Sequence, residues 1–237
     1  SAALIVVGNE VLSGRTQDTN TSWIAGQLTD MGITLHQVRV VPDMEGEIVT
    51  AIHDLKDVVD HVFTTGGIGP THDDITAQSI AKAFGVELEL HPEAFQILVR
   101  HYGDEAQVTP PRKKMAMVPK GASLINNPVS GAPGFQIENV FVMAGVPKIM
   151  QAMFDDVKTR LKRGKPFLSN TISCSLGESM VAHDLEAIQN RYSSVSIGSY
   201  PHYRGGVTGL SLFLRATENY MLHAATDEVF AMIGRLG

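Results

Sequence analysis

Residues Thr64–Thr76, TTGGIGPTHDDIT, decide how this sequence folds and where its functional site lies. The stretch follows a short apolar segment, Val62-Phe63, and precedes a helix-like segment over residues 75–84. A strand that breaks into glycines and then opens a helix leaves several backbone N–H groups without partners around one concavity. Such a nest of amides, with the positive end of a helix dipole behind it, is suited to binding a phosphate.

Two adjacent carboxylates, Asp73 and Asp74, follow the glycines directly. Carboxylates repel a phosphate unless a hard cation lies between them, so the pair predicts a divalent metal (Mg²⁺, Mn²⁺ or Co²⁺) beside the phosphate. A structural alternative is a tight turn in which Asp73 or Asp74 caps the helix and Thr76 lies in its first turn. Three glycines, a proline and the doubled aspartate together favour the ligand site.

The chain before this stretch alternates strand-like and helix-like segments. A continuous apolar run over residues 2–7 ends at Gly8, as in a strand that is buried on both faces of a parallel sheet. A helix over residues 19–31, a strand over 33–41 and a second helix over 45–56 follow. This alternation predicts a mostly parallel sheet between two layers of helices, a three-layer αβα sandwich of the α/β class.

In such sheets, ligands bind beyond the carboxyl ends of the strands. Asn9 and Glu10 follow the first predicted strand, Asp43 follows the second, and the glycine stretch follows the third. We therefore expect these separate pieces of polar sequence to meet at one edge of the sheet. Glu10 is a candidate there for accepting a proton from an attacking water.

Two later turns are candidates for the far side of this site. Loop-rich sequence at residues 126–134 leads into a hairpin with strands over 135–137 and 140–143. Residues 144–147, AGVP, then break the chain before another helix. Ordinary hairpin and helix-entry chemistry would explain both turns equally well.

The sequence also predicts a second, smaller domain. We place the first domain at residues 1–163, since RGKP at 163–166 is typical of a linker. Residues 167–237 then show the order β-α-β-β-α of a small α+β domain, with Gly205-Gly206 in the hairpin between its last two strands.

Composition limits the partners. The 237 residues carry a net charge of −6 and show no Lys/Arg stripe, so we expect no nucleic-acid partner, because binding to a phosphate backbone needs a basic face. The basic triplet Arg112-Lys113-Lys114 indicates a solvated charged surface, with steering of anions as the alternative interpretation.

Cysteine usage and hydropathy indicate the compartment. The single cysteine, Cys174, excludes an internal disulfide and fits a reducing compartment, so we expect a cytoplasmic protein. No apolar run approaches membrane-spanning length and no signal peptide is visible, so we expect no membrane partner. The chain begins at Ser1 without Met, which indicates a trimmed start.

The glycine stretch, TTGGIGPTHDDIT, resembles the signature of the molybdenum-cofactor biosynthesis (MoaB/Mog-type) domain. GNEVLSG at residues 8–14, GAPG at 131–134 and GVP at 145–147 are similar to the amino-terminal part of the competence-damage-inducible protein A (CinA) family. Residues 167–237, with IGSYP at 197–201, look like that family's small second domain. The resemblance covers nearly the whole chain.

The resemblance implies a molybdopterin-binding-domain-like fold that binds a phosphorylated pterin or nucleotide, and it implies a homo-oligomer. For the CinA branch it implies divalent-metal-dependent cleavage of the pyrophosphate in ADP-ribose. Asp74 matches an aspartate that the molybdenum-cofactor branch uses in catalysis, and Asp43 matches a second functional aspartate. The phosphate loop and the rest of the ligand site are expected at Gly66, Gly67, Gly69, Thr71, Asn20, Ser130, Gly131, Gly134 and Gly145.

Two positions depart from the family pattern. Asn9 stands where Thr is usual, which could alter a ligand hydrogen bond, and Ala144 replaces a proline, which loosens a turn. The amidase domain of full-length CinA proteins is missing from this sequence, so we expect no deamidation of nicotinamide mononucleotide. We expect an ADP-ribose pyrophosphatase. The alternatives are adenylyl transfer to or from molybdopterin, and a non-catalytic module that binds a nucleotide or pterin.

Overall fold

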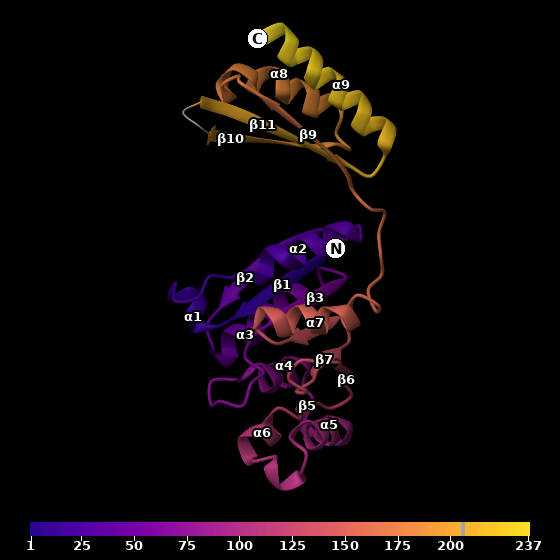
Figure 1. Ribbon diagram of the computed structural model, residues 1–237. Coiled ribbons are helices and arrows are strands. Elements are labelled where there is room, and N and C mark those ends of the chain that lie inside the picture. The colour runs from indigo at the N-terminus through magenta and orange to yellow at the C-terminus, as the bar shows by residue number, and fades with distance from the viewer. Residues whose placement is uncertain (205–206) are drawn as a thin grey trace. The chain divides into compact units, whose positions relative to one another are not determined.

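The computed structural model describes residues 1–204 and 207–237, which form two compact units (Figure 1). The first unit comprises residues 1–29 and 33–163, and the second comprises residues 30–32 and 164–237. The turn expected at Gly205-Gly206 lies outside the described residues. Within the described ranges, no helix combines the length and the apolar character needed to cross a bilayer.

The first unit is built on a six-stranded sheet in the order β2-β1-β3-β8-β7-β6. β1 pairs in parallel with β2 and with β3, and β3 pairs in parallel with β8, whereas β7 runs antiparallel to β8 and to β6. This arrangement confirms the predicted mostly parallel sheet. The strands are β1 (Ala2–Val7), β2 (Leu35–Val41), β3 (His61–Thr65), β6 (Ser123–Ile125), β7 (Gly134–Ile137) and β8 (Val140–Met143).

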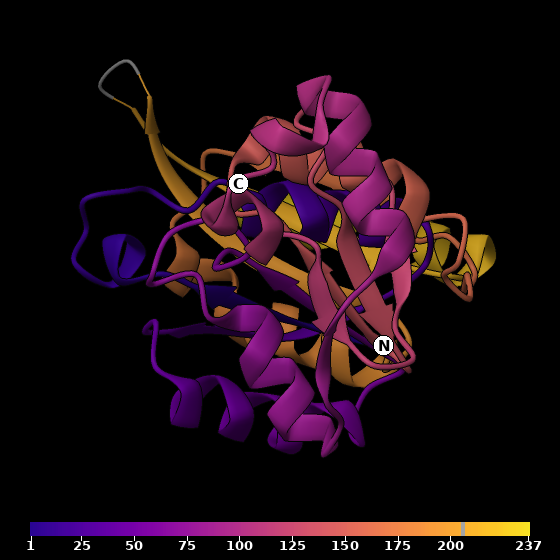
Figure 2. The same ribbon diagram turned by 90° about the horizontal axis from the view of Figure 1, so that it is seen from below.

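Helices cover both faces of this sheet and complete the predicted αβα sandwich. Helices α3 (Glu45–Lys56) and α4 (Thr76–Phe84) bury their apolar sides in one core cluster with alternate strand residues such as Ile5. On the other face Phe63 lies 5.5 Å from Phe141 and 5.9 Å from Phe154, measured between ring centroids. Figure 2 shows the purple helices α3 and α4 side by side along one face of the sheet. The helices of the Phe63 face are α2 (Asn20–Asp30) and α7 (Pro147–Val157).

A small appendage follows α4. The antiparallel strands β4 (Leu88–Leu90) and β5 (Met117–Pro119) enclose the helices α5 (Pro92–Tyr102) and α6 (Pro110–Lys114) and the short 3₁₀ turn η1 (Glu105–Gln107) in sequence. This appendage has its own small apolar cluster, made of Ala94, Leu98, Val108 and Ala116. The appendage matters for the site because it places α6 next to the glycine stretch.

The second unit has an antiparallel three-stranded sheet in the order β10-β11-β9 and two helices. Its elements confirm the predicted β-α-β-β-α order. They are β9 (Leu168–Cys174), α8 (Glu178–Arg191), β10 (Ser196–Arg204), β11 (Val207–Ala216) and α9 (Asn219–Leu236). Apolar residues of both helices and of β9 and β11 form one core cluster, which includes Val181, Leu212, Leu214 and Val229.

Candidate functional site

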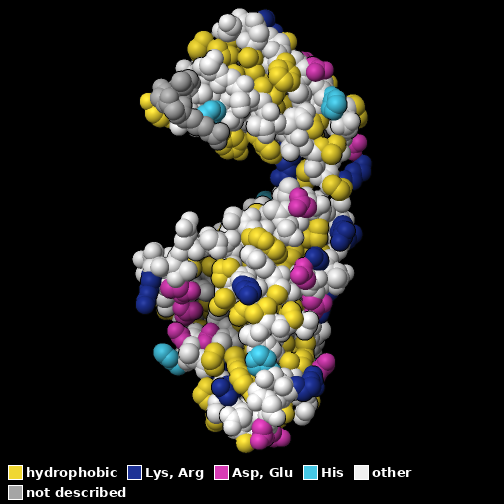
Figure 3. Space-filling model, viewed as in Figure 1, with side chains coloured by type: hydrophobic (Ala, Val, Ile, Leu, Met, Phe, Trp, Pro, Cys, Tyr) yellow, Lys and Arg dark blue, Asp and Glu magenta, His cyan; other side chains and the backbone are white. Residues whose placement is uncertain are grey.

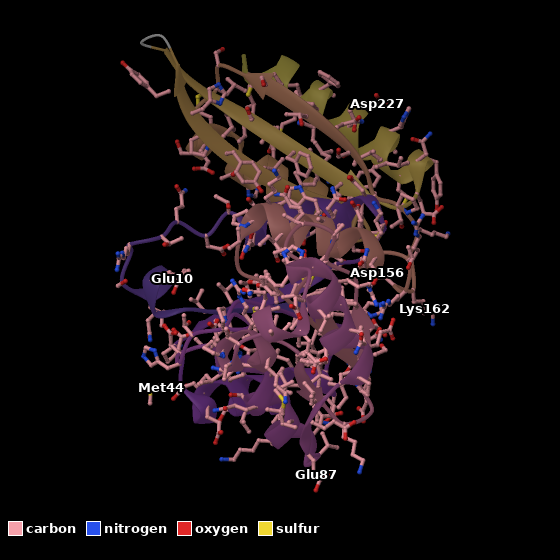
Figure 4. The ribbon with its side chains drawn as sticks, turned by 60° about the horizontal axis from the view of Figure 1, so that its bottom comes forward. Glu10, Met44, Glu87, Asp156, Lys162 and Asp227 are labelled. Atoms are coloured by element: carbon pink, nitrogen blue, oxygen red, sulfur yellow. The ribbon has the colours of Figure 1, made fainter. Side chains whose placement is uncertain are left out.

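The carboxyl ends of β1, β2, β3 and β8 meet at one edge of the first sheet, as the sequence predicts. The backbone amide of Asn9, which begins the short helix α1 (Asn9–Leu12), donates to Asp43 Oδ2 at 2.8 Å. Asn20 Nδ2, at the start of α2, donates to the carbonyl of Gly145 at 2.8 Å. Figure 4 shows Glu10 and Met44 on this side of the unit, and Lys162 on the opposite side.

Glycines allow three strand ends to touch backbone to backbone. Gly66 has φ +100°, and a Cβ atom there would lie 2.2 Å from the carbonyl oxygen of Val7 at the end of β1. A Cβ atom on Gly145, after β8, would lie 3.1 Å from the Cα atom of Gly66. A side chain at Gly66 is therefore excluded by the packing and by the positive φ angle, whereas one at Gly145 would need its neighbour to move by a few tenths of an ångström.

The glycine stretch turns into α4 through Thr76. The hydroxyl of this buried threonine donates to the carbonyl of Gly66 at 2.9 Å, and its amide donates to the carbonyl of Gly67 at 3.0 Å. The N-cap residue of α4 is Ile75, which provides no side-chain cap. The structural alternative, in which Asp73 or Asp74 caps this helix, is therefore wrong.

Instead, Asp73 and Asp74 both converge on Thr71. Asp74 Oδ2 accepts the Thr71 amide at 2.8 Å and lies 2.5 Å from the Thr71 hydroxyl oxygen, which also lies 2.6 Å from Asp73 Oδ1. The hydrogen bond from Thr71 is the main reason why the pKa of Asp73 is lowered, with smaller contributions from the charges of His72 and Lys114. Two carboxylates thus share one hydroxyl proton.

This geometry fits a divalent cation between the two carboxylates. A hydroxyl has one proton, so at any moment only one of the two carboxylate oxygens receives it, and the other faces an oxygen lone pair. A hard cation relieves that repulsion, and Mg²⁺ is typically held by one or two carboxylates together with phosphate oxygens. No group of three His, Cys, Asp or Glu side chains suited to a metal occurs within residues 1–204 and 207–237. Asp73 and Asp74 are the residues here that could hold a divalent cation together with ligand oxygens.

A pocket lies against the glycine stretch. We call it the glycine-loop pocket. In the described parts of the chain, the amides of Gly67, Ile68 and Gly69 have no hydrogen-bond acceptor. Three adjacent unpaired amides beside a pocket are the feature that the sequence predicts for a phosphate. The lining residues are Gly67, Ile68, Gly69, Asp74, Ala77, Gln78, Leu88, Lys114, Met115, Met117, Val118, Pro133 and Phe135.

A second pocket, lined in part by Thr65 and Gly145, is called the Asn20 pocket below. Asn20 is 6% exposed and Thr65 is 1% exposed, yet Asn20 Oδ1 and Thr65 Oγ1 have no partner among the described residues. Buried polar atoms without partners are costly, so these two predict a ligand or ordered water. The lining residues are Val6, Val7, Glu10, Val11, Thr16, Gln17, Asp18, Thr19, Asn20, Thr65, Gly145 and Pro147.

Three further residues expected in the ligand site, Ser130, Gly131 and Gly134, line neither pocket. Ser130 Oγ accepts from Asn127 Nδ2 at 2.7 Å within its own loop. A Cβ atom on Gly131 would lie 2.6 Å from the ring of His101, and one on Gly134 would lie 2.3 Å from the carbonyl oxygen of Val142. These contacts explain why glycine is found at both positions without invoking a ligand.

The two departures from the family pattern have different structural settings. Asn9 uses its backbone amide, not its side chain, to hold Asp43. The amide of Ala144 donates to Met153 Sδ at 3.5 Å, a bond that a proline could not make.

Sequence reasoning missed two residues of this site. Thr65 precedes the glycines, and only its buried position at the end of β3 shows that its hydroxyl reaches the Asn20 pocket. Lys114 lies 43 positions from Thr71 in the sequence, yet its Nζ donates to the Thr71 carbonyl. The sequence carried no signal for that contact.

Comparisons with known proteins agree with this fold. The family described as "Probable molybdopterin binding domain" matches residues 3–163, and "FAD synthase, middle domain" matches residues 166–235. A protein of Pyrobaculum arsenaticum is 44% identical over 172 residues, covering 70% of this chain but only 65% of its own length. A protein of Archaeoglobus fulgidus is 34% identical over 198 residues, which cover 84% of each chain.

One solved structure is also close. CinA from Thermoplasma acidophilum, a protein with unknown function, has a TM-score of 0.64 and 38% identity, and the match covers 67% of this chain and 96% of that one. The chain therefore belongs to the molybdopterin-binding domain family over its first unit, which is similar to CinA of Thermoplasma acidophilum, and its second unit matches the middle domain of FAD synthase.

Proposed function

We propose that the first unit binds a phosphorylated nucleotide or pterin and hydrolyses the pyrophosphate of an ADP-ribose-like substrate with a divalent metal. The observation that carries this proposal is the set of three adjacent unpaired amides, Gly67 to Gly69, in a pocket that Asp74 also lines. Phosphate oxygens are the natural acceptors for such amides. The carboxylates beside them give the phosphate a metal-binding partner.

The two pockets favour a ligand with two ends and a phosphate bridge between them. Thr65 lines the Asn20 pocket and Gly67 lines the glycine-loop pocket, so the two pockets are separated along the chain only by Gly66. The Asn20 pocket offers the unpartnered atoms Asn20 Oδ1 and Thr65 Oγ1, which suit sugar hydroxyls or a heterocycle. The glycine-loop pocket offers amides, which suit phosphate. A nucleoside diphosphate sugar has this distribution of groups.

The proposed reaction converts ADP-ribose and water into AMP and ribose 5-phosphate. The water oxygen forms a bond to one phosphorus atom, the bridging P–O bond breaks, and the water proton passes to a carboxylate. The amides of Gly67, Ile68 and Gly69 would stabilise the charge that develops on the phosphoryl oxygens. Glu10, which lines the Asn20 pocket, is the candidate for accepting the proton. A divalent cation held by Asp73 and Asp74 would supply additional charge neutralisation.

A second candidate is adenylyl transfer to or from molybdopterin. It is favoured by the description of the family that matches residues 3–163, which names molybdopterin. This reaction would use the same amides for the phosphate.

The test is incubation of the protein with ADP-ribose, FAD and ATP in parallel, each with Mg²⁺, Mn²⁺ or Co²⁺, and chromatography for AMP. Asp74→Asn is assayed alongside. AMP from ADP-ribose that disappears in the variant supports the proposal. Turnover only with ATP and molybdopterin supports adenylyl transfer. Absence of turnover in all arms, with folded and metal-loaded protein, would contradict hydrolysis.

A further inference from the structure

The three adjacent cations of α6 have different surroundings. The guanidinium of Arg112 lies 3.9 Å from the centre of the Tyr102 ring and donates to the carbonyl of Gln107 at 2.7 Å. The ammonium of Lys113 lies 5.8 Å from the centre of the Phe95 ring. Lys114 alone of the three lines the glycine-loop pocket, where its Nζ donates to the carbonyl of Thr71. The predicted solvated surface therefore does not describe Lys114.

The ammonium of Lys114 has unused donors. It carries three N–H groups, and the contact with Thr71 uses one of them. Within residues 1–204 and 207–237, Lys114 forms no ion pair and makes no other hydrogen bond. Its side chain is half-buried, and the unused N–H groups have no partner among the described residues.

We propose that Lys114 binds a phosphoryl oxygen of the ligand, opposite the unpaired amides of Gly67 to Gly69. The contact with Thr71 holds the ammonium at the mouth of the pocket and ties α6 to the glycine stretch. The inference rests on the proposed phosphate site, but it does not require hydrolysis. Lys114 is a binding residue, and its charge gives the site affinity for a diphosphate in the absence of a metal.

The charge arrangement supports this role. Asp73 and Asp74 alone would make the pocket repel an anion in the absence of a metal. The ammonium of Lys114 offsets part of that charge, and hydrogen bonds from charged donors to phosphate are the strong ones. On the face shown in Figure 3, Lys and Arg side chains are dispersed among the side chains that are coloured by type.

The test measures binding of inorganic pyrophosphate by calorimetry in EDTA, over a range of salt concentrations. We expect the wild-type protein to bind with an affinity that falls as salt rises. Lys114→Met should bind at least about tenfold more weakly, with a flatter salt dependence, because a charged hydrogen bond is lost. Lys114→Arg should keep most of the affinity, since it restores the charge. Lys113→Met, which alters the neighbouring cation outside the pocket, is the matched control and should bind as the wild type does.

Thermal unfolding of each variant shows whether the loop remains in place, and Lys114→Gln provides an uncharged donor should Lys114→Met prove unstable. Binding by folded Lys114→Met or Lys114→Gln at wild-type strength would overturn the inference. Failure of the wild-type protein to bind pyrophosphate in EDTA would overturn it as well. Loss of ADP-ribose hydrolysis with intact, Lys114-dependent pyrophosphate binding would instead refute only the proposed reaction.

Discussion

One carboxylate oxygen of Asp74 accepts both the amide and the hydroxyl of Thr71, at 2.8 and 2.5 Å. The residue that the family resemblance marks as catalytic therefore also closes the turn that follows the glycines. A substitution that removes the whole Asp74 side chain would disturb both the turn and the catalytic role. Replacement of Asp74 by asparagine keeps the shape of the side chain and removes only its charge.

Asp74→Asn should keep the fold and lose the activity. The amide oxygen can still accept from Thr71, so we expect the melting temperature to change by no more than a few degrees. The negative charge is lost, and we expect metal-dependent turnover to fall by at least about 100-fold. Asp57→Asn, at an exposed aspartate paired with Lys56, is the control and should be neutral in both assays. Undiminished turnover in Asp74→Asn under saturating metal would exclude the proposed role.

Gly66→Ala should be strongly destabilising. The new methyl group would lie 2.2 Å from the Val7 carbonyl oxygen on a backbone with φ +100°, so we expect a loss of at least about 2 kcal/mol in the free energy of unfolding. Gly26→Ala is the matched control, because Gly26 lies inside helix α2 and a Cβ atom there meets nothing within 4 Å. That substitution should stabilise the protein by about 0.5–1 kcal/mol. Urea unfolding of both variants checks the pair, and similar small effects would contradict the packing at the strand ends.

Thr65→Val should raise stability and weaken ligand binding. Thr65 Oγ1 is buried without a partner among the described residues, so its replacement by a methyl group should gain about 1 kcal/mol in the absence of ligand. Thr64→Val is the control, because Thr64 is equally buried with an unpartnered hydroxyl but does not line the Asn20 pocket. We expect both variants to be more stable, and only Thr65→Val to lose affinity for ADP-ribose. Equal affinity in the two variants would exclude the Thr65 hydroxyl as a ligand contact.

Acidification should destabilise the first unit through His61. Burial against Phe63 and Phe141 lowers the pKa of His61 below its usual value of 6.5, so the folded state holds fewer protons than the unfolded state. Its stabilising contribution is complete above pH 6.5 and declines as the pH falls through 6.5 towards the lowered pKa. Urea unfolding at a series of pH values measures this decline, and His61→Phe should remove it. An unchanged decline in stability below pH 6.5 in His61→Phe would assign that decline to another group.

The parallel core of the fold was predictable because its pattern is strong and local. The continuous apolar run at residues 2–7 and the helical spacing of Ile48 and Ile52 each point to one kind of element. By contrast, β5 and β6 have three residues each, too few for a period to emerge, and they exist through pairing with β4 and β7.

The site residues that directly follow strands were predictable from the sequence. The residues that distant segments bring to the site were not. Asn9, Asp43 and the glycine stretch meet because parallel strands end together. Lys114 joins them through the appendage between β4 and β5, whose folding no local pattern of the glycine stretch encodes. A glycine in the sequence does not by itself indicate a ligand site. Gly131 and Gly134 were expected to contact the ligand, yet close contacts with His101 and Val142 are enough to explain glycine at these positions.

The proposed site depends most on a phosphate bound by three backbone amides. The direct measurement is a titration of ¹⁵N-labelled protein with ADP-ribose in EDTA, followed by amide NMR with Gly67, Ile68 and Gly69 assigned. We expect the amide protons of these three residues to shift downfield together at a common dissociation constant, because each gains an anionic acceptor. Unchanged resonances for all three, while saturable shifts occur elsewhere in the folded protein, would contradict the proposed site.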